Sequence, residues 1–170
     1  MGEHSYGSIK NSNGDVSIGK YCSIAGGVTT VILNDHCVNW ISTYPFRKTM
    51  GVTEAAHPVA RQNPRIIIEN DVWIGQNATL LEDTILRNGA VIGSYSVVHG
   101  EIPAYCIAIG NPARVVKKRF SDEDIESLLQ IQWWNWPDEK VKAYAPILCS
   151  DNIKEFINMV ENETISNKIS

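Results

Sequence analysis

The sequence predicts a β-solenoid, in which the chain winds into a triangular prism from short strands that each end in a turn. The first observation is a six-residue repeat between residues 68 and 104. Its aliphatic positions are Ile68, Ile74, Leu80, Leu86, Ile92 and Val98, and the smaller Ala104 continues the register. An amphipathic helix repeats every 3.6 residues and a strand every 2, so a strict period of six is typical of neither alone. It is typical of a coil with three hexads per turn, whose aliphatic side chains stack inward.

The second observation is the size of the residue four places after each aliphatic. These residues are Val72, Ala78, Thr84, Ala90 and Ser96, which are mostly small, and finally Ile102. The corner of a narrow prism has room for one branched aliphatic beside one small group. Gly75 and Gly93 directly follow two of the aliphatics, as expected at tight corners where a Cβ would be costly. A β-sandwich with chance spacing is the alternative, which so long a register disfavours.

The third observation is an interruption of the repeat. The register begins at Ile18 and Ile24, fails from about residue 34 to residue 64, and then resumes. A solenoid tolerates insertions at its corners, and such loops commonly carry function. The inserted loop contains His36, His57, Trp40, Tyr44 and Phe46. A linker would not need so many aromatic residues, so we expect the loop to fold onto the prism or onto a neighbouring subunit.

After the last hexad the pattern becomes helical. Pro112 ends the strand pattern, and a short basic cluster follows it. Ser121, with Asp124 three residues later, resembles a capping box and predicts a helix with one apolar face. Pro137 suits the first turn of a second helix, and a third apolar helical pattern follows Ser150. The expected role of this tail is to cap the last coil, whose open edge would otherwise pair with other chains.

The predicted organisation is an all-β solenoid domain over residues 1–119, with the loop 34–64 inserted, and a C-terminal helical extension over residues 120–170. Residues 1–15 are expected to form a lead-in loop or an irregular first coil. At 170 residues the chain is long enough to bury a hydrophobic core.

Composition argues against several classes of function. The formal net charge of -4 gives no broad basic field, so nucleic acid is not an expected partner. There is no run of 18 apolar residues and no leader-like start, which predicts no membrane association and a cytoplasmic protein. The four cysteines are scattered without CxxC spacing, so neither a zinc knuckle nor a disulfide framework is indicated.

His36 is the candidate general base. It lies where the register breaks, and its sequence neighbours include Asn34, Asp35, Asn39 and Trp40, a polar group beside an aromatic residue. An imidazole can take up a proton near neutral pH. A histidine with a purely structural role in the loop is the alternative, and His57, next to Pro58, is the rival base.

Other chemistries are open for the loop. Cys37 adjoins His36, but neighbouring residues of an extended chain point in opposite directions, so a thiol–imidazole dyad would have poor geometry. A metal site from His36, His57 and Asp35 has no recognisable ligand spacing, so no metal is predicted. Carbonic anhydrase activity would need a trio of histidine ligands, which the spacing of His36, His57 and His99 does not indicate.

Several motifs together resemble a known family. The hexads with the stretch DVWIG at residues 71–75, the IGNPAR exit and the loop HCVNWISTYPF resemble the left-handed parallel β-helix acyltransferases. Within them the chain resembles the xenobiotic acetyltransferases, which include streptogramin and chloramphenicol acetyltransferases. Their loop has the form His-x-x-Asp-Trp-x-Ser-Thr-Phe/Tyr-Pro-Phe, which stands here as His36, Asn39, Trp40, Ser42, Thr43, Tyr44, Pro45 and Phe46. The tail RFSDEDIESLLQIQWWNWP also resembles theirs, and the likeness covers roughly residues 16–145.

The resemblance implies transfer of an acetyl group from acetyl-CoA to a hydroxyl or amine of a small molecule, such as a sugar or an antibiotic-like acceptor. The family's catalytic histidine matches His36, which would act as general base without a covalent enzyme intermediate. The family is trimeric and binds CoA in the groove between neighbouring prisms, so a homotrimer with active sites between subunits is implied. Packing three prisms side by side would also bury flat faces that a monomer leaves open.

The same resemblance points to individual site residues. The positions that resemble the family's CoA contacts are Trp73, Gln76, Ser94, His99, Arg114 and Lys117. The candidates for the acceptor pocket are Asn39, Trp40, Ser42 and Tyr44. Arg114 and Lys117 suit the phosphates of CoA, with a solvated basic face as the alternative. Trp73 could instead be an interface aromatic, and the residues of the acceptor pocket could instead hold the loop down.

Two departures from the family pattern bear on the acceptor. Asn39 stands where the family has Asp, which removes a charge near His36. The segment after Phe46 is shorter than in the streptogramin enzymes, which makes an antibiotic acceptor less expected. A different class of function is the remaining alternative, namely a catalytically silent β-helix that serves as an assembly or binding scaffold.

Overall fold

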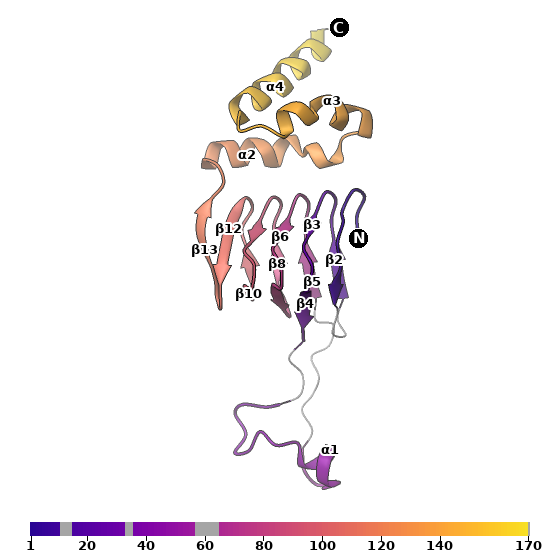
Figure 1. Cartoon of the computed structure of the whole chain (residues 1–170), viewed down its shortest axis with the longest axis vertical. Helices are drawn as coiled ribbons and strands as arrows, with labels where there is room; N and C mark the ends of the chain where they lie inside the picture. Colours follow the sequence, from indigo (N-terminus) through magenta and orange to yellow (C-terminus); the bar gives the residue numbers. More distant parts are fainter. Residues whose placement is uncertain (11–14, 33–35, 57–64, 170) are drawn as a thin grey trace.

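The computed structural model describes residues 1–10, 15–32, 36–56 and 65–169. Figure 1 shows a prism of short strands, with the inserted loop projecting on one side and the C-terminal helices on the opposite side. The prism is a left-handed parallel β-helix with one sheet on each of its three faces, so the predicted fold class is confirmed.

Successive strands of the chain move from face to face around the prism. Sheet A contains β3 (Ser23–Ile24), β6 (Trp73–Ile74), β9 (Val91–Ile92), β12 (Cys106–Gly110) and β13 (Ala113–Lys118). Sheet B contains β1 (Ile9–Lys10), β4 (Val28–Val31), β7 (Thr79–Leu81) and β10 (Val97–Val98). Sheet C contains β2 (Asp15–Ile18), β5 (Arg65–Ile68), β8 (Ile85–Leu86) and β11 (Glu101–Ile102).

Three edges join these sheets, and each edge is a stack of turns. Edge AB, between sheets A and B, contains residues 75–78 and 93–96. Edge BC contains residues 82–84 and 99–100, and the inserted loop leaves the prism on this edge, between β4 and β5. Edge CA contains residues 69–72, 87–90 and 103–105.

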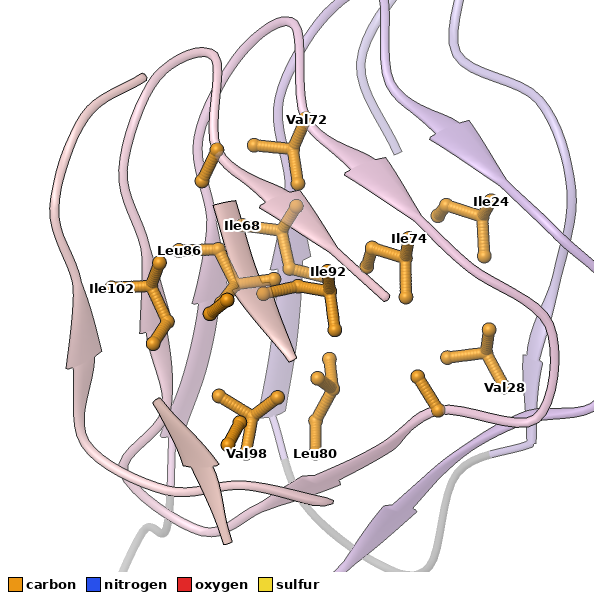
Figure 2. Packing of buried hydrophobic residues seen from close by; sticks show 14 of the residues in the cluster. Ile24, Val28, Ile68, Val72, Ile74, Leu80, Leu86, Ile92, Val98 and Ile102 are labelled. Atoms are coloured by element: carbon orange, nitrogen blue, oxygen red, sulfur yellow. The ribbon is translucent and has the colours of Figure 1, made fainter. Parts of the chain in front are cut away.

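The hexad side chains form the core of the prism. The six aliphatic positions from Ile68 to Val98 are each at most 2% exposed, and Figure 2 shows them directed into the interior. The small positions Val72, Ala78, Thr84, Ala90 and Ser96 are also buried. The two buried hydroxyls are satisfied, because Thr84 Oγ1 donates to the carbonyl of Val98 at 3.1 Å and Ser96 Oγ accepts from Gly110 N at 3.1 Å. Ala104 departs from the prediction, because it packs under the C-terminal helices instead of in the prism core.

Both ends of the prism are built from the chain itself. At the first end, Gly2 N donates to Ile18 O at 2.8 Å and β1 pairs with β4, so residues 1–10 form a first coil, one of the two arrangements expected from the sequence. At the other end the chain reverses at Pro112, and β13 pairs with β12 in the antiparallel sense. The predicted exit from the coil is therefore a hairpin, and the basic cluster that begins at Lys117 extends from the last strand of sheet A.

The helical tail forms as predicted. It consists of α2 (Asp122–Ile131), the 3₁₀ turn η1 (Trp133–Asn135), α3 (Asp138–Leu148) and α4 (Ile153–Ile169). Ser121 Oγ accepts from Asp124 N at 3.2 Å and donates to Asp124 Oδ2 at 2.9 Å, so Ser121 is the N-cap of α2 and the predicted helix start is confirmed. Pro137 precedes α3, as its fixed φ favours.

The position of the tail differs from the expected cap on the last coil. The helices lie along edge CA (Figure 1), where Tyr21 contacts Trp133 at 4.8 Å and Tyr105 contacts Phe120 at 5.8 Å between ring centroids. The tail is not needed at the end of sheet A, because β13 already pairs with the open edge of β12. Aromatic residues on edge CA instead present apolar surface that the helices cover, in a second cluster built around Leu128 and other buried side chains.

The described part of the inserted loop, residues 36–56, lies beyond edge BC and contains the short helix α1 (Phe46–Met50) (Figure 1). Of the two placements expected from the sequence, packing onto its own prism is not observed for these residues. Several large apolar side chains of the loop are exposed, among them Val38, Trp40, Ile41, Tyr44, Phe46 and Met50.

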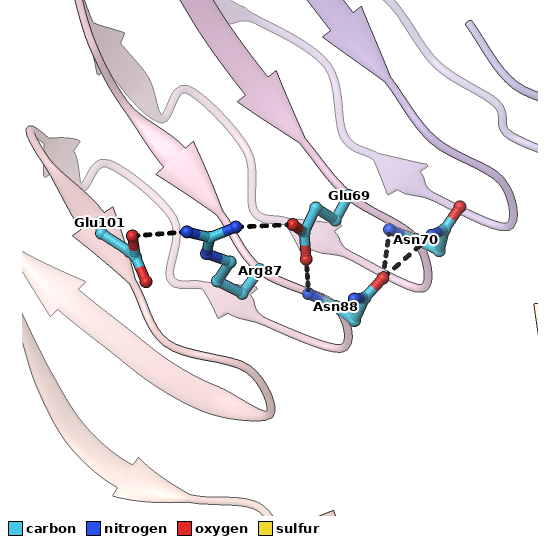
Figure 3. Close-up of polar contacts among 5 residues, drawn as sticks. All are labelled: Glu69, Asn70, Arg87, Asn88 and Glu101. Carbon is cyan, nitrogen blue, oxygen red and sulfur yellow. Dashed lines mark hydrogen bonds and ion pairs between the residues drawn. The ribbon is translucent and has the colours of Figure 1, made fainter. Parts of the chain in front are cut away.

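Sheet C and edge CA carry a ladder of polar contacts (Figure 3). Asn70 Nδ2 donates to Asn88 Oδ1 at 2.9 Å, which links two successive coils. Arg87 donates to Glu69 at 2.9 Å and to Glu101 at 2.8 Å. Ion pairs this exposed each contribute only about 0–1 kcal/mol, so the ladder identifies a solvated face more than a source of stability.

We expect Leu86→Ala to lower the free energy of unfolding by about 2–5 kcal/mol, because Leu86 is fully buried and its truncation leaves a cavity in the prism. Ile85, its neighbour in β8, is only partly buried, so Ile85→Ala should cost roughly 1 kcal/mol or less. Chemical denaturation followed by circular dichroism measures both variants. Equal losses would contradict the inward stacking of the hexads.

A second prediction concerns acid stability. The hydrogen bond from Lys154 lowers the pKa of Asp124 below its usual value of 3.8, and Ser121 adds to the effect. A carboxyl whose pKa is lower in the folded state stabilises the protein above its unfolded pKa, and this contribution is lost as the pH falls through the folded pKa. Asp124→Asn should therefore destabilise the protein at neutral pH, with a difference from wild type that shrinks below about pH 4. Thermal unfolding across this range, with the exposed Glu126→Gln as control, measures it.

Candidate active site

The inserted loop supplies the candidate general base. His36 is exposed, and its Nδ1 lies 2.6 Å from the carbonyl oxygen of Thr43. A carbonyl oxygen can only accept, so Nδ1 carries the proton, and Nε2 of the neutral ring keeps a free lone pair. This is the tautomer that a general base acting through Nε2 requires.

A tight turn in the loop presents that carbonyl. Tyr44 N donates to Ser42 Oγ at 3.1 Å, and the ring of Tyr44 meets Phe46 edge-on at 4.9 Å. Ser42 therefore shapes the turn that carries Thr43. The four predicted acceptor residues, Asn39, Trp40, Ser42 and Tyr44, are all exposed on the same loop as His36.

The alternatives for the loop are a thiol–imidazole dyad, a second histidine base and a metal site. The His36 ring is hydrogen-bonded to Thr43 instead of to Cys37, and Cys37 O accepts from Trp40 N at 3.3 Å. His57 and Asp35 lie outside the described residues. Within the described ranges, no three His, Cys, Asp or Glu side chains come together as a metal site.

Sheet A gathers three of the predicted cofactor contacts. Strand pairing sets Trp73 opposite Val91, Val91 opposite Ile107, and Ile107 opposite Lys117, so these residues form one row on the outer face. Ile109 is paired with Arg114 in the next row. Trp73 is 57% exposed and both cations are exposed, so this face combines an indole with two positive charges.

Edge AB borders this face and carries two further candidates. Gln76 and Ser94 are exposed and lie in adjacent coils, where Tyr95 N donates to the carbonyl of Gln76 at 2.8 Å. Gly75 makes the close stacking possible, because a Cβ at this position would lie 2.5 Å from Ser94 N. Edge AB therefore offers a straight and closely packed border to the outer face of sheet A.

His99 is separated from the other cofactor candidates. It lies on edge BC, and its Nδ1 is 3.2 Å from the carbonyl oxygen of Glu82. Within a single chain, His99 therefore does not share an edge with Gln76 and Ser94. The reason is the geometry of the coil, because five residues after Ser94 the chain has crossed sheet B to the next edge.

Sequence reasoning missed three residues beside Trp73. A groove of about 350 Å³ on sheet A includes Tyr21, Asp71 and Arg119 in its lining, together with Trp73 and neighbouring apolar side chains. Arg119 Nη1 lies 3.5 Å from Asp71 Oδ2. Asp71 is the first residue of the DVWIG stretch, and Arg119 is the last residue of the basic cluster. Both residues therefore belong to motifs that are visible in the sequence.

Comparison with known proteins shows which family this chain belongs to. A model of the family described as bacterial transferase hexapeptide (six repeats) matches residues 65–100. A chloramphenicol acetyltransferase of Klebsiella aerogenes is 41% identical over 140 residues, which span 80% of this chain and 67% of that protein. A probable macrolide acetyltransferase of Lysinibacillus sphaericus is 40% identical over 161 residues, or 92% and 88% of the two chains. A virginiamycin A acetyltransferase of Staphylococcus aureus is 37% identical over 81% of this chain and 64% of its own.

The fold and these relatives define a hexapeptide-repeat transferase. The chain belongs to the hexapeptide-repeat acetyltransferases, in the xenobiotic branch that contains the chloramphenicol acetyltransferases. The protein is accordingly an acetyltransferase, as the sequence predicts. Within the described ranges, no helix has the length and apolar character needed to cross a membrane.

A solved structure supports the fold alone. AntD, an N-acyltransferase from Bacillus cereus solved in complex with dTDP-4-amino-4,6-dideoxyglucose and Coenzyme A, superimposes with a TM-score of 0.50. Its sequence identity is 15%, and the match covers 77% of this chain and 65% of that chain. The prism is thus shared with an enzyme of very different sequence.

We expect Gly75→Ala to destabilise the protein by about 1–3 kcal/mol, because the added Cβ would meet backbone atoms of the next coil at 2.5–2.9 Å. Gly26→Ala is the matched control, since Gly26 also lies between strands of sheets A and B, but its Cβ would have no heavy atom within 4 Å. Denaturation midpoints of the two variants measure the difference. Tolerance of both substitutions would contradict the close stacking on edge AB.

Proposed function

We propose that the protein transfers an acetyl group from acetyl-CoA to a hydroxyl or amine of a small-molecule acceptor, with His36 as general base. The observation that carries this proposal is the 2.6 Å contact between His36 Nδ1 and the carbonyl of Thr43, which leaves Nε2 as the basic atom on an exposed loop. Relatives named for acetylation of chloramphenicol, macrolides and virginiamycin support a small organic acceptor.

The chemistry assigned to His36 is proton transfer. Nε2 takes the proton of the acceptor hydroxyl or amine as the acceptor oxygen or nitrogen attacks the thioester carbonyl. The C–S bond then breaks, and the imidazolium returns the proton to the departing CoA thiolate. Positioned acid–base groups of this kind typically contribute about 10²–10⁴-fold to the rate. No residue needs to form a covalent intermediate, in keeping with a Cys37 that is not hydrogen-bonded to the His36 ring.

The outer face of sheet A has the chemistry to hold acetyl-CoA, which would supply the activated acetyl group. Trp73 offers an apolar surface for the pantetheine arm, and Gln76 and Ser94 border that face through the backbone of edge AB. Arg114 and Lys117 extend from β13 and suit phosphate groups. His99, on edge BC, would reach the same cofactor only from a neighbouring subunit.

Two features support the proposal of a homotrimer with active sites between subunits. First, the apolar side chains of the loop are exposed, with Ile41 fully exposed and Val38 at 90%. Second, the outer rows of sheets A and B include partly buried apolar residues such as Val91, Ile107, Leu81 and Val97. Contacts between sheets A and B of adjacent prisms would bury these apolar rows and leave the charged ladder of Glu69, Arg87 and Glu101 in water.

We expect His36→Ala to lower the turnover number by at least about 100-fold, with a smaller effect on the KM for acetyl-CoA, because the variant loses proton transfer and keeps sheet A. His4→Ala, which removes a histidine next to α3, is the control. Thiol release from acetyl-CoA in the presence of chloramphenicol, a macrolide, virginiamycin and a sugar panel measures both. Unchanged turnover in His36→Ala would exclude the general-base assignment, and no turnover by the wild type with any acceptor would favour a scaffold.

Sharing of the site between subunits has its own test. Ser94→Trp should block the border of sheet A, and His36→Ala should remove the base, so each pure variant is expected to be inactive. Co-expressed chains of the two variants should regain activity, because a neighbouring pair then combines an intact His36 with an intact Ser94. If mixed assemblies of confirmed trimer mass stay inactive, the base and the cofactor face belong to one chain.

A further inference from the structure

We propose that the cavity between the C-terminal helices and edge CA is a binding site for a small uncharged molecule with an apolar body and a single hydroxyl group. The cavity has a volume of about 340 Å³. It is lined from the helices by Leu128, Trp133, Val141, Ala145, Ile147 and Phe156. An apolar cavity of about 150 Å³ is already large enough to take up benzene, so this one has room for a substituted ring.

Three polar side chains converge on this apolar chamber. Tyr105 is 1% exposed, and its hydroxyl has no hydrogen-bond partner among the described atoms. Asp71 and Arg119 line the same chamber, with 3.5 Å between Asp71 Oδ2 and Arg119 Nη1. A buried hydroxyl without a partner is costly, and a ligand hydroxyl that meets Tyr105 Oη would remove that cost.

The charges in the cavity favour an uncharged ligand. Arg119 Nη1 donates to Gly89 O at 2.8 Å, and the guanidinium faces the rings of Tyr105 and Phe120 at 5.3 Å and 5.2 Å. Its charge is balanced by Asp71. Burial raises the pKa of Tyr105, and the nearby Asp71 raises it further, so the phenol keeps its proton and can donate. Burial also raises the pKa of Asp71, which Arg119 opposes.

This cavity is separate from the proposed catalytic loop. Edge CA carries the cavity, whereas the loop with His36 leaves the prism at edge BC. Tyr21, Asp71 and Arg119 line both the cavity and the groove beside Trp73, so an occupant would sit next to the proposed cofactor face without lying in it. The inference does not depend on the acetyl-transfer mechanism.

The test uses 4-propylphenol as the probe and propylbenzene as its matched compound without the hydroxyl. Isothermal titration calorimetry of the full chain should give one 4-propylphenol per chain, bound about 5- to 10-fold more tightly than propylbenzene, the factor that one net hydrogen bond supplies. Tyr105→Phe should remove this preference and leave the thermal midpoint unchanged or higher, because it deletes an unpartnered buried hydroxyl.

A matched pair of variants locates the site. Ala145 lines the cavity, so Ala145→Trp should abolish binding of both probes, whereas Trp at the exposed Ala143 of the same helix should leave binding intact. The exposed Cys149 also lines the cavity, so 4-propylphenol should slow its alkylation relative to Cys37, read by peptide mass spectrometry. Absence of binding, equal affinity of the two probes, or equal binding by the Ala145 and Ala143 variants would each overturn the proposal.

Discussion

The structure depends on the inward stacking of one aliphatic side chain per hexad. Each buried aliphatic meets its counterparts in the coils above and below, so the core specifies where every turn must fall. Outer positions are free of this constraint, which is why Trp73, Arg114 and Lys117 can share the outer face of sheet A. A regular interior thus allows three edges with different tasks: one borders the candidate cofactor face, one releases the loop, and one receives the helices.

The parts of the fold that local signals encode were predictable. The repeat identified the buried positions from Ile68 to Val98, and the capping pattern at Ser121 identified the start of α2. The parts of the fold that depend on tertiary contacts were not predictable from local signals. The tail was expected on the last coil. No local signal indicates that β13 folds back and occupies that edge, or that the aromatic corners at Tyr21 and Tyr105 receive the helices.

For the candidate site, the choice of residues could be predicted from the sequence, but the contacts between them could not. The break in the repeat and the neighbouring residues singled out His36, whereas the family resemblance pointed to Trp73 and Lys117, which the strand register sets in one row. The contact that fixes the His36 tautomer could not be foreseen, since it depends on how the turn at Ser42 orients the Thr43 carbonyl. His99 lies on a different edge from Gln76 and Ser94, because only residues separated by a whole coil return to the same edge of the prism.

The stacking has a consequence for how such a chain can change its length. Trp73 pairs with Val91 and Thr79 with Val97, so equivalent positions in consecutive coils are eighteen residues apart. Loss or gain of a single hexad would keep the interior intact but turn everything that follows by one side of the prism, and the helices would then meet a different edge. Only a change of three hexads preserves both packing and direction. Lineages of this fold are therefore expected to grow or shrink by whole coils and to vary freely only where a loop leaves a corner.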